Sequence, residues 1–126
     1  MEFVRPLEPI LIIDDDKSMR RSLSTILTEL GYDQICETTD ISDATPIIKQ
    51  IEPRVIFVDV ALPDSDGCDI VSYLSEANPH SQIILCADHN SFENVEHNWE
   101  FGAQEYISKP FNANKVDMVM KRLELS

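Results

Sequence analysis

Cysteine and glycine are scarce in this sequence. Cys36, Cys68 and Cys86 stand far apart, are odd in number and form no Cys-x-x-Cys pair. This spacing argues against a disulfide framework or a zinc site, so we expect reduced thiols in a cytosol. The chain has only 3 glycines, which argues against a fibrous or disordered chain.

Long apolar runs are absent as well. No stretch reaches the roughly 18 apolar residues of a membrane span, and the N-terminus lacks the apolar run of a signal peptide. We therefore expect a soluble, cytoplasmic protein.

Positive charge is also in short supply, since 10 Lys and Arg face 23 Asp and Glu, for a net charge of −13. A surface of this charge repels the phosphates of nucleic acids and the headgroups of anionic lipids. We therefore expect no direct contact with nucleic acid or membrane. A well-solvated surface accounts for most of the acidic residues, but not for three consecutive aspartates at residues 14–16.

Short apolar runs alternate with longer segments of helical period. Continuous runs of β-branched and aliphatic residues predict strands that are buried on both faces, as in a parallel sheet. These runs are residues 10–13, 55–58 and 83–86, with weaker candidates for outer strands at 34–37 and 105–107.

Apolar residues spaced three to four apart predict five helices. We expect Ser18 to cap the first helix and Gly31 to end it. Pro46 is tolerable only in a first turn, so the second helix should start near Ser42. The others are expected at residues 67–77, at residues 91–101 and after an Asn112 cap. Five strand–helix units predict one domain, 1–126, with helices on both faces of an open, doubly wound α/β sheet.

Polar residues follow several of the predicted strands, and ligands bind at the carboxyl ends of strands in such sheets. The residues at these positions are Asp14, Asp15 and Asp16, then Asp59, Cys86 and Lys109. Clustered carboxylates need a cation to stay ionised together, and hard oxygen ligands suit Mg²⁺. A remaining carboxylate can attack phosphorus to form an acyl phosphate, and a lysine can stabilise a phosphoryl oxygen.

Three segments together resemble the receiver domain of two-component response regulators of the chemotaxis-regulator type. They read IIDDDKSMR, VDVALPDSDG and EYISKPF, and the resemblance covers residues 9–125. It implies a flavodoxin-like (βα)5 three-layer sandwich whose five-stranded parallel sheet has the order 2-1-3-4-5. It also implies a phosphoryl-accepting switch in a phosphorelay, not an enzyme with turnover on a free substrate. Self-phosphorylation from small donors and self-dephosphorylation remain compatible with such a switch.

The resemblance implies a partner at each end of the signal. A histidine kinase or histidine phosphotransfer protein would donate the phosphoryl group. A downstream effector or output domain would bind the face formed by the fourth helix, fifth strand and fifth helix.

The resemblance assigns a role to each residue of the acidic site. Asp59 matches the phosphoacceptor, and Asp14 and Asp15 match the paired acidic residues that bind Mg²⁺. The backbone carbonyl of Ala61 matches a further metal ligand. Lys109 matches the lysine that pairs with the phosphoryl group and precedes a proline through a bond that is usually cis.

Two further positions concern switching. Tyr106 matches an aromatic residue that swings inward on activation. The family normally has serine or threonine where this chain has Cys86, and that hydroxyl hydrogen-bonds a phosphoryl oxygen. A thiol is a bulkier and much weaker donor. We therefore expect phosphorylation to persist and its coupling to Tyr106 and the fourth helix to weaken.

Three other functions compete with the phosphoryl switch. Asp14-x-Asp16-x-Ser18 approximates the signature of haloacid-dehalogenase-type phosphohydrolases, but that family usually has a longer chain and leaves Asp59 unexplained. A flavodoxin-like electron carrier needs an uncharged phosphate loop where this chain has three aspartates. A degenerate receiver acting as a protein-binding adaptor gains support from Cys86.

Overall fold

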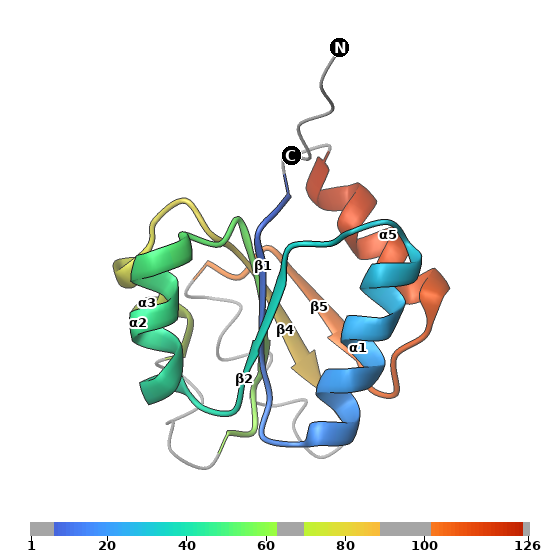
Figure 1. Ribbon diagram of the computed structural model, residues 1–126, viewed down its shortest axis with the longest axis horizontal. Coiled ribbons are helices and arrows are strands. Elements are labelled where there is room, and N and C mark those ends of the chain that lie inside the picture. Colours follow the sequence, from blue (N-terminus) through green and yellow to red (C-terminus); the bar gives the residue numbers. More distant parts are fainter. Residues whose placement is uncertain (1–6, 63–69, 89–101, 125–126) are drawn as a thin grey trace.

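A single parallel sheet forms the middle layer of the protein (Figure 1). The structure is a computed structural model that describes residues 7–62, 70–88 and 102–124. All neighbouring strands pair in parallel, in the order β2-β1-β3-β4-β5, as predicted. The strands are β1 (Ile10–Ile13), β2 (Ile35–Thr38), β3 (Val55–Asp59), β4 (Gln82–Ala87) and β5 (Glu105–Ser108). The two weaker apolar runs form the edge strands β2 and β5. An edge strand is less buried than a central one, which explains why these two runs are less apolar.

Helices cover both faces of this sheet. The described helices are α1 (Lys17–Glu29), α2 (Ile41–Ile51), α3 (Ile70–Ala77) and α5 (Ala113–Glu124). Helices α1 and α5 lie on one face, whereas α2 and α3 lie on the other (Figure 1). The architecture is therefore the expected flavodoxin-like, three-layer α/β fold.

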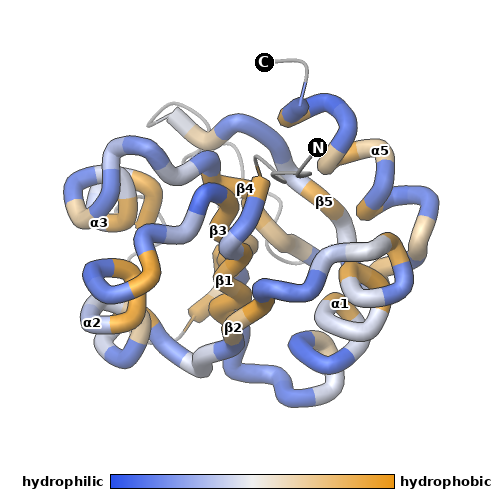
Figure 2. Tube along the Cα trace, turned by 45° about the horizontal axis from the view of Figure 1, so that its top comes forward, coloured by the Kyte–Doolittle hydropathy of each residue, from blue (hydrophilic) through white to orange (hydrophobic). Residues whose placement is uncertain are grey.

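Each face of the sheet has its own hydrophobic core, because successive side chains of a strand point to opposite faces. Ile10 and Ile12 pack in the core with α1 and α5, whereas Leu11 and Ile13 pack in the core with α2 and α3. All four side chains are 0–1% exposed. Apolar residues accordingly run through the central strands, and hydrophilic stretches follow the outer helices (Figure 2). None of the described helices combines the length and apolar character needed to cross a bilayer.

The predicted cap of α1 is wrong by two residues. Asp16, not Ser18, is the N-cap, and its Oδ1 accepts hydrogen bonds from the backbone N–H groups of Ser18 and Met19 at 2.9 and 3.2 Å. Both residue types are good caps, so local preference does not choose between them. The predicted end at Gly31 is confirmed, since Gly31 has φ +104° and its N–H donates to the Thr28 carbonyl at 3.0 Å.

The predicted start of the second helix near Ser42 is confirmed to within one residue. It begins at Ile41, capped by Asp40, whose side chain accepts from the Asp43 N–H at 2.7 Å. Pro46 therefore lies in the second turn. Its missing N–H deprives only the carbonyl of Ser42, an exposed residue that water can reach.

The remaining helix predictions can be checked in part. Asn112 caps α5 as expected, because its Oδ1 accepts from the Lys115 N–H at 2.9 Å. The third predicted helix ends at Ala77 as expected, and its start lies outside the described residues. The helix predicted at 91–101 lies wholly outside them.

Candidate functional site: an acidic pocket at the carboxyl ends of the strands

Three aspartates gather where β1 and β3 end. Asp14 follows β1 and is 3% exposed, and Asp59 is the last residue of β3 and is 6% exposed. Asp15 is exposed. One carboxylate oxygen from each of the three lies within 4.8 Å of the others. These residues are far apart in sequence, and parallel pairing of β1 with β3 brings them together.

Lys109 reaches this cluster from the end of β5. Its Nζ lies 2.8 Å from Asp14 Oδ2 and 3.5 Å from Asp59 Oδ2, and its side chain is 12% exposed. Burial by itself would lower the pKa of Lys109, but the hydrogen bond to Asp14 and the charge of Asp59 outweigh it and raise that pKa. Lys109 is therefore a permanent ammonium at neutral pH. It is joined to Pro110 by a cis peptide bond.

Asp59 experiences opposing influences. Burial is the largest and raises the pKa of its carboxyl, helped by the neighbouring charges of Asp14 and Asp15. The Ala61 N–H, which donates to Asp59 Oδ1 at 3.0 Å, and the Lys109 ammonium act in the other direction. The net result is a raised pKa. Extra positive charge beside Asp59 would therefore favour its ionised, nucleophilic form.

The three aspartates of the loop between β1 and α1 make different contacts. Asp14 Oδ1 accepts the Asp16 N–H at 2.9 Å, so Asp14 is held by this loop as well as by Lys109. Asp16 caps α1 and is engaged with the helix. Asp14 and Asp15 are thus the two members of the triplet that join Asp59.

The chemistry of this cluster fits a divalent cation. When ionised, three carboxylates against one ammonium leave two negative charges unbalanced. All donors are hard oxygens with open access through Asp15, which suits Mg²⁺ with part of its water shell. Asp14, Asp15 and Asp59 could hold the ion from the protein side. Ala61, the expected backbone ligand, is exposed beside Asp59.

Cys86 lies beside Asp59 across the sheet. The two residues are partners in the register of β3 and β4, so their side chains point to the same face. Cys86 is 2% exposed, and burial raises the pKa of its thiol well above the usual value. It is therefore a neutral S–H group next to the acidic cluster.

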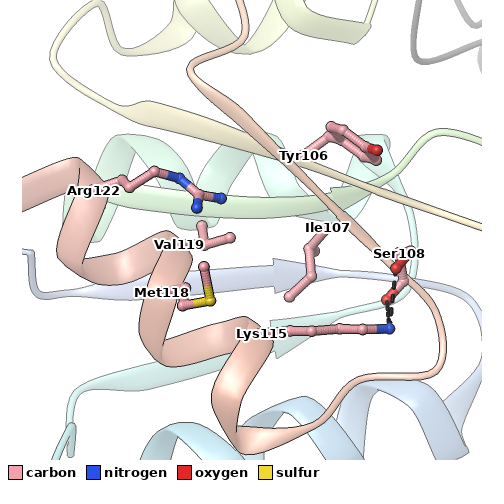
Figure 3. A pocket seen from close by; sticks show the side chains of 7 residues that line it. All are labelled: Tyr106, Ile107, Ser108, Lys115, Met118, Val119 and Arg122. Carbon is pink, nitrogen blue, oxygen red and sulfur yellow. Dashed lines mark hydrogen bonds between the residues drawn. The ribbon is translucent and has the colours of Figure 1, made fainter.

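Tyr106 lies on β5, away from the acidic cluster, and its side chain is 43% exposed. It borders a cavity of about 220 Å³ between β5 and α5. Figure 3 shows Tyr106 and Ile107 on opposite sides of the strand, with Met118 and Arg122 reaching from α5. This cavity is the described part of the face expected to bind partners, because the fourth helix lies outside the described residues.

Two basic residues that support the acidic pocket were not predicted from the sequence. Lys115 Nζ reaches Ser108 Oγ at 3.0 Å and the Pro110 carbonyl at 3.1 Å, so it braces the segment that carries Lys109 (Figure 3). Arg20 Nη1 donates to the backbone carbonyl of Asp14 at 2.7 Å. Both contacts link a helix to a loop that folds back on it, and sequence spacing carries no signal for that.

Known proteins resemble this chain closely in sequence and fold. The chemotaxis protein CheY of Thermotoga maritima is 30% identical over 107 residues, which cover 85% of this chain and 89% of that protein. The crystal structure of the receiver domain of NtrX from Brucella abortus superposes with a TM-score of 0.84 at 28% identity, covering 94% of this chain and all of that domain. The beryllofluoride-activated NtrC4 receiver domain dimer gives a TM-score of 0.80 at 32% identity, with 93% and 98% coverage.

Some relatives are much longer than this chain. The regulatory protein AtoC of Escherichia coli is 26% identical over 113 residues, which are 90% of this chain and 24% of AtoC. Residues 10–121 match the family described as the response regulator receiver domain. With the expected sheet order, the acidic cluster and this match in agreement, the chain belongs to the response regulator receiver domain family of two-component signalling.

Proposed function

We propose that this receiver is a phosphoryl-accepting switch in which Asp59 takes the phosphoryl group. The observation that carries the proposal is the meeting of Asp14, Asp15 and Asp59 with Lys109 at one edge of the sheet. A carboxylate oxygen of Asp59 attacks the phosphorus of a phosphohistidine on a kinase or phosphotransfer protein. The P–N bond breaks, the imidazole takes up a proton as it leaves, and an acyl phosphate remains on Asp59.

The residues around Asp59 would each contribute to this transfer. Asp14, Asp15, Asp59 and the Ala61 carbonyl would hold Mg²⁺, which supplies charge to neutralise phosphoryl oxygens. Lys109 already lies 3.5 Å from Asp59 and can pair with a phosphoryl oxygen as charge builds up there. The activity is then a stoichiometric modification of the chain, which sets it apart from turnover of a free substrate.

A small phosphodonor tests the proposal directly. We expect acetyl phosphate with Mg²⁺ to add the mass of one phosphoryl group to the intact protein. The gain should vanish in Asp59→Asn and when EDTA removes the metal. As a matched control, Asp16→Asn removes an aspartate that caps a helix, and it should keep the gain. Absence of a gain with any donor would contradict the acceptor role, and a gain that persists in Asp59→Asn would move the acceptor elsewhere.

We also propose that Cys86 weakens the response of this switch. Cys86 is register-paired with Asp59, so its thiol stands where a hydroxyl could bond a phosphoryl oxygen. Introducing that hydroxyl with Cys86→Thr should enlarge the change at Tyr106 on phosphorylation. NMR of selectively labelled tyrosine measures it. If phosphorylation changes the Tyr106 signals equally in the wild type and in Cys86→Thr, the thiol does not weaken the response.

The partners follow from the same proposal. The donor would be a histidine kinase or phosphotransfer protein, and the phosphorylated form would bind a downstream effector or output domain at the β5–α5 cavity and the fourth helix. We propose that residues 1–126 act as one receiver domain in the cytoplasm. The continuous five-stranded sheet from Ile10 to Ser108 supports the single domain.

One observation favours a second candidate, a receiver that serves as a constitutive adaptor. The buried thiol of Cys86 supplies no strong donor for a phosphoryl group. An adaptor would bind its partner equally well with and without phosphorylation, whereas the switch requires a difference in affinity.

A further inference from the structure

Arg20 links the acidic pocket to an edge strand. It lies in α1, and its side chain is 14% exposed. Its Nη1 donates to the Asp14 carbonyl at 2.7 Å, and its Nε lies 3.5 Å from Glu37 Oε1 on β2. A planar guanidinium with several fixed donors can hold two groups at a defined angle. Arg20 thus connects α1, the β1–α1 loop and β2.

The bond from Arg20 is placed at the peptide that joins Asp14 to Asp15. The peptide N–H groups before and after it are also bonded, since the Asp14 N–H donates to the Thr38 carbonyl at 3.1 Å and the Asp16 N–H donates to Asp14 Oδ1 at 2.9 Å. Arg20 holds the Asp14 carbonyl, and with it the orientation of the Asp14–Asp15 peptide. The direction of the Asp14 carbonyl defines ψ of Asp14, so the bond from Arg20 restrains the path by which the backbone enters Asp15.

Of the three carboxylates, that of Asp15 depends most on the backbone for its position. Asp14 and Asp59 are 3% and 6% exposed, so the surrounding side chains confine them. Asp15 is exposed, and packing holds it least. Its position therefore depends on the backbone that precedes it.

We infer that Arg20 is a positioning residue for metal binding, which sets the Asp14–Asp15 peptide so that the Asp15 carboxylate completes the site. This inference rests on the proposed Mg²⁺ site. It makes a claim that simple electrostatics opposes, because a cation beside a cation site should weaken metal binding. Removing Arg20 would tighten Mg²⁺ binding if its charge dominated, and it weakens binding if its geometry dominates.

Calorimetric titration of the unphosphorylated protein with MgCl₂ shows whether removing Arg20 strengthens or weakens Mg²⁺ binding. Groups that hold metal ligands in place typically contribute at least about tenfold in affinity, so we expect Arg20→Gln to raise the Kd for Mg²⁺ by about that factor. Arg20→Lys keeps the charge without the planar fork, and we expect it to raise the Kd as well. Arg21→Gln is the matched control, because Arg21 is the exposed neighbour with the same charge, and its Kd should stay within about twofold.

The outcomes separate this inference from the proposed function. If the wild type binds no Mg²⁺, both the metal site and the role of Arg20 fail. If the wild type binds Mg²⁺ and Arg20→Gln binds it as tightly or more tightly, only the role of Arg20 is overturned. Circular dichroism in EDTA checks that each variant is folded. Should Arg20→Gln unfold, Arg20→Lys decides by the same criterion.

Discussion

Replacing Lys109 by methionine would leave the acidic pocket without its ammonium while keeping a side chain of similar length. Lys109 Nζ is 2.8 Å from Asp14 and 3.5 Å from Asp59, and all three side chains are largely buried. Water therefore compensates little for its loss, and two close carboxylates repel each other. We expect Lys109→Met to destabilise the metal-free domain.

The size of the loss follows from two limits. Removing one partner of a buried ion pair costs about 3–5 kcal/mol. The domain can escape by protonating one carboxylate, which for an aspartate of ordinary pKa costs about 4.2 kcal/mol at pH 7 and about 1.5 kcal/mol at pH 5. Because the pKa of Asp59 is raised, its protonation costs less than these ordinary-value figures. The expected loss is therefore at most about 4 kcal/mol at pH 7 and at most about 1.5 kcal/mol at pH 5. Because the pKa of Lys109 is raised, its own charge is constant over this range.

Urea unfolding in EDTA, followed by circular dichroism at both pH values, measures these differences. Lys121→Met is the control, since Lys121 is exposed and pairs with Asp117 at 2.9 Å on the surface of α5. Its unfolding midpoint should match that of the wild type. A Lys109→Met protein as stable as the wild type at pH 7 would refute the reasoning. So would a loss of equal size at pH 5 and pH 7, because protonation would then not be the escape.

Three further predictions follow from the same contacts. Burial raises the pKa of Asp59 in the folded protein, so folding favours its protonated form. The stability gained from this protonated carboxyl is complete below the ordinary aspartate pKa and is lost as the pH rises through the pKa of Asp59 in the folded protein. Metal-free Asp59→Asn should thus be more stable than the wild type at pH 7, with the gap closing below about pH 4, and thermal unfolding that shows no gap at pH 7 would contradict this. Asn112→Ala removes the N-cap of α5. In urea titrations it should lower the free energy of unfolding by about 1 kcal/mol, and an unchanged midpoint would show that this cap does not stabilise the domain. Lys115→Met releases Ser108 and Pro110 beside Lys109 and should slow phosphorylation by acetyl phosphate about threefold, equivalent to roughly one weak hydrogen bond; an unchanged rate would show that Lys109 needs no brace.

The strands and the positions of the charged residues followed from local pattern. Runs such as Val55–Val58 are apolar at every residue because both faces of a parallel strand are buried, so their number and order along the chain were readable. Helix ends were less certain. Asp16 and Ser18 are both capable caps, and only the path of the β1–α1 loop selected Asp16. Pro46 located the start of the second helix to within one residue, and its place in the second turn is tolerated because water can reach the carbonyl of Ser42, which lacks an N–H donor.

The sequence by itself determined which residues could take part in the acidic pocket. The carboxyl ends of the strands in a doubly wound sheet share one edge, and this rule predicts from the sequence that Asp14, Asp59 and Lys109 lie close together. Only the tertiary structure decided how they are held. The contacts of Arg20 with the Asp14 carbonyl and of Lys115 with Ser108 join side chains to backbone oxygens and a hydroxyl across loops. Such contacts depend on loop paths and three-dimensional distances, which residue spacing does not encode.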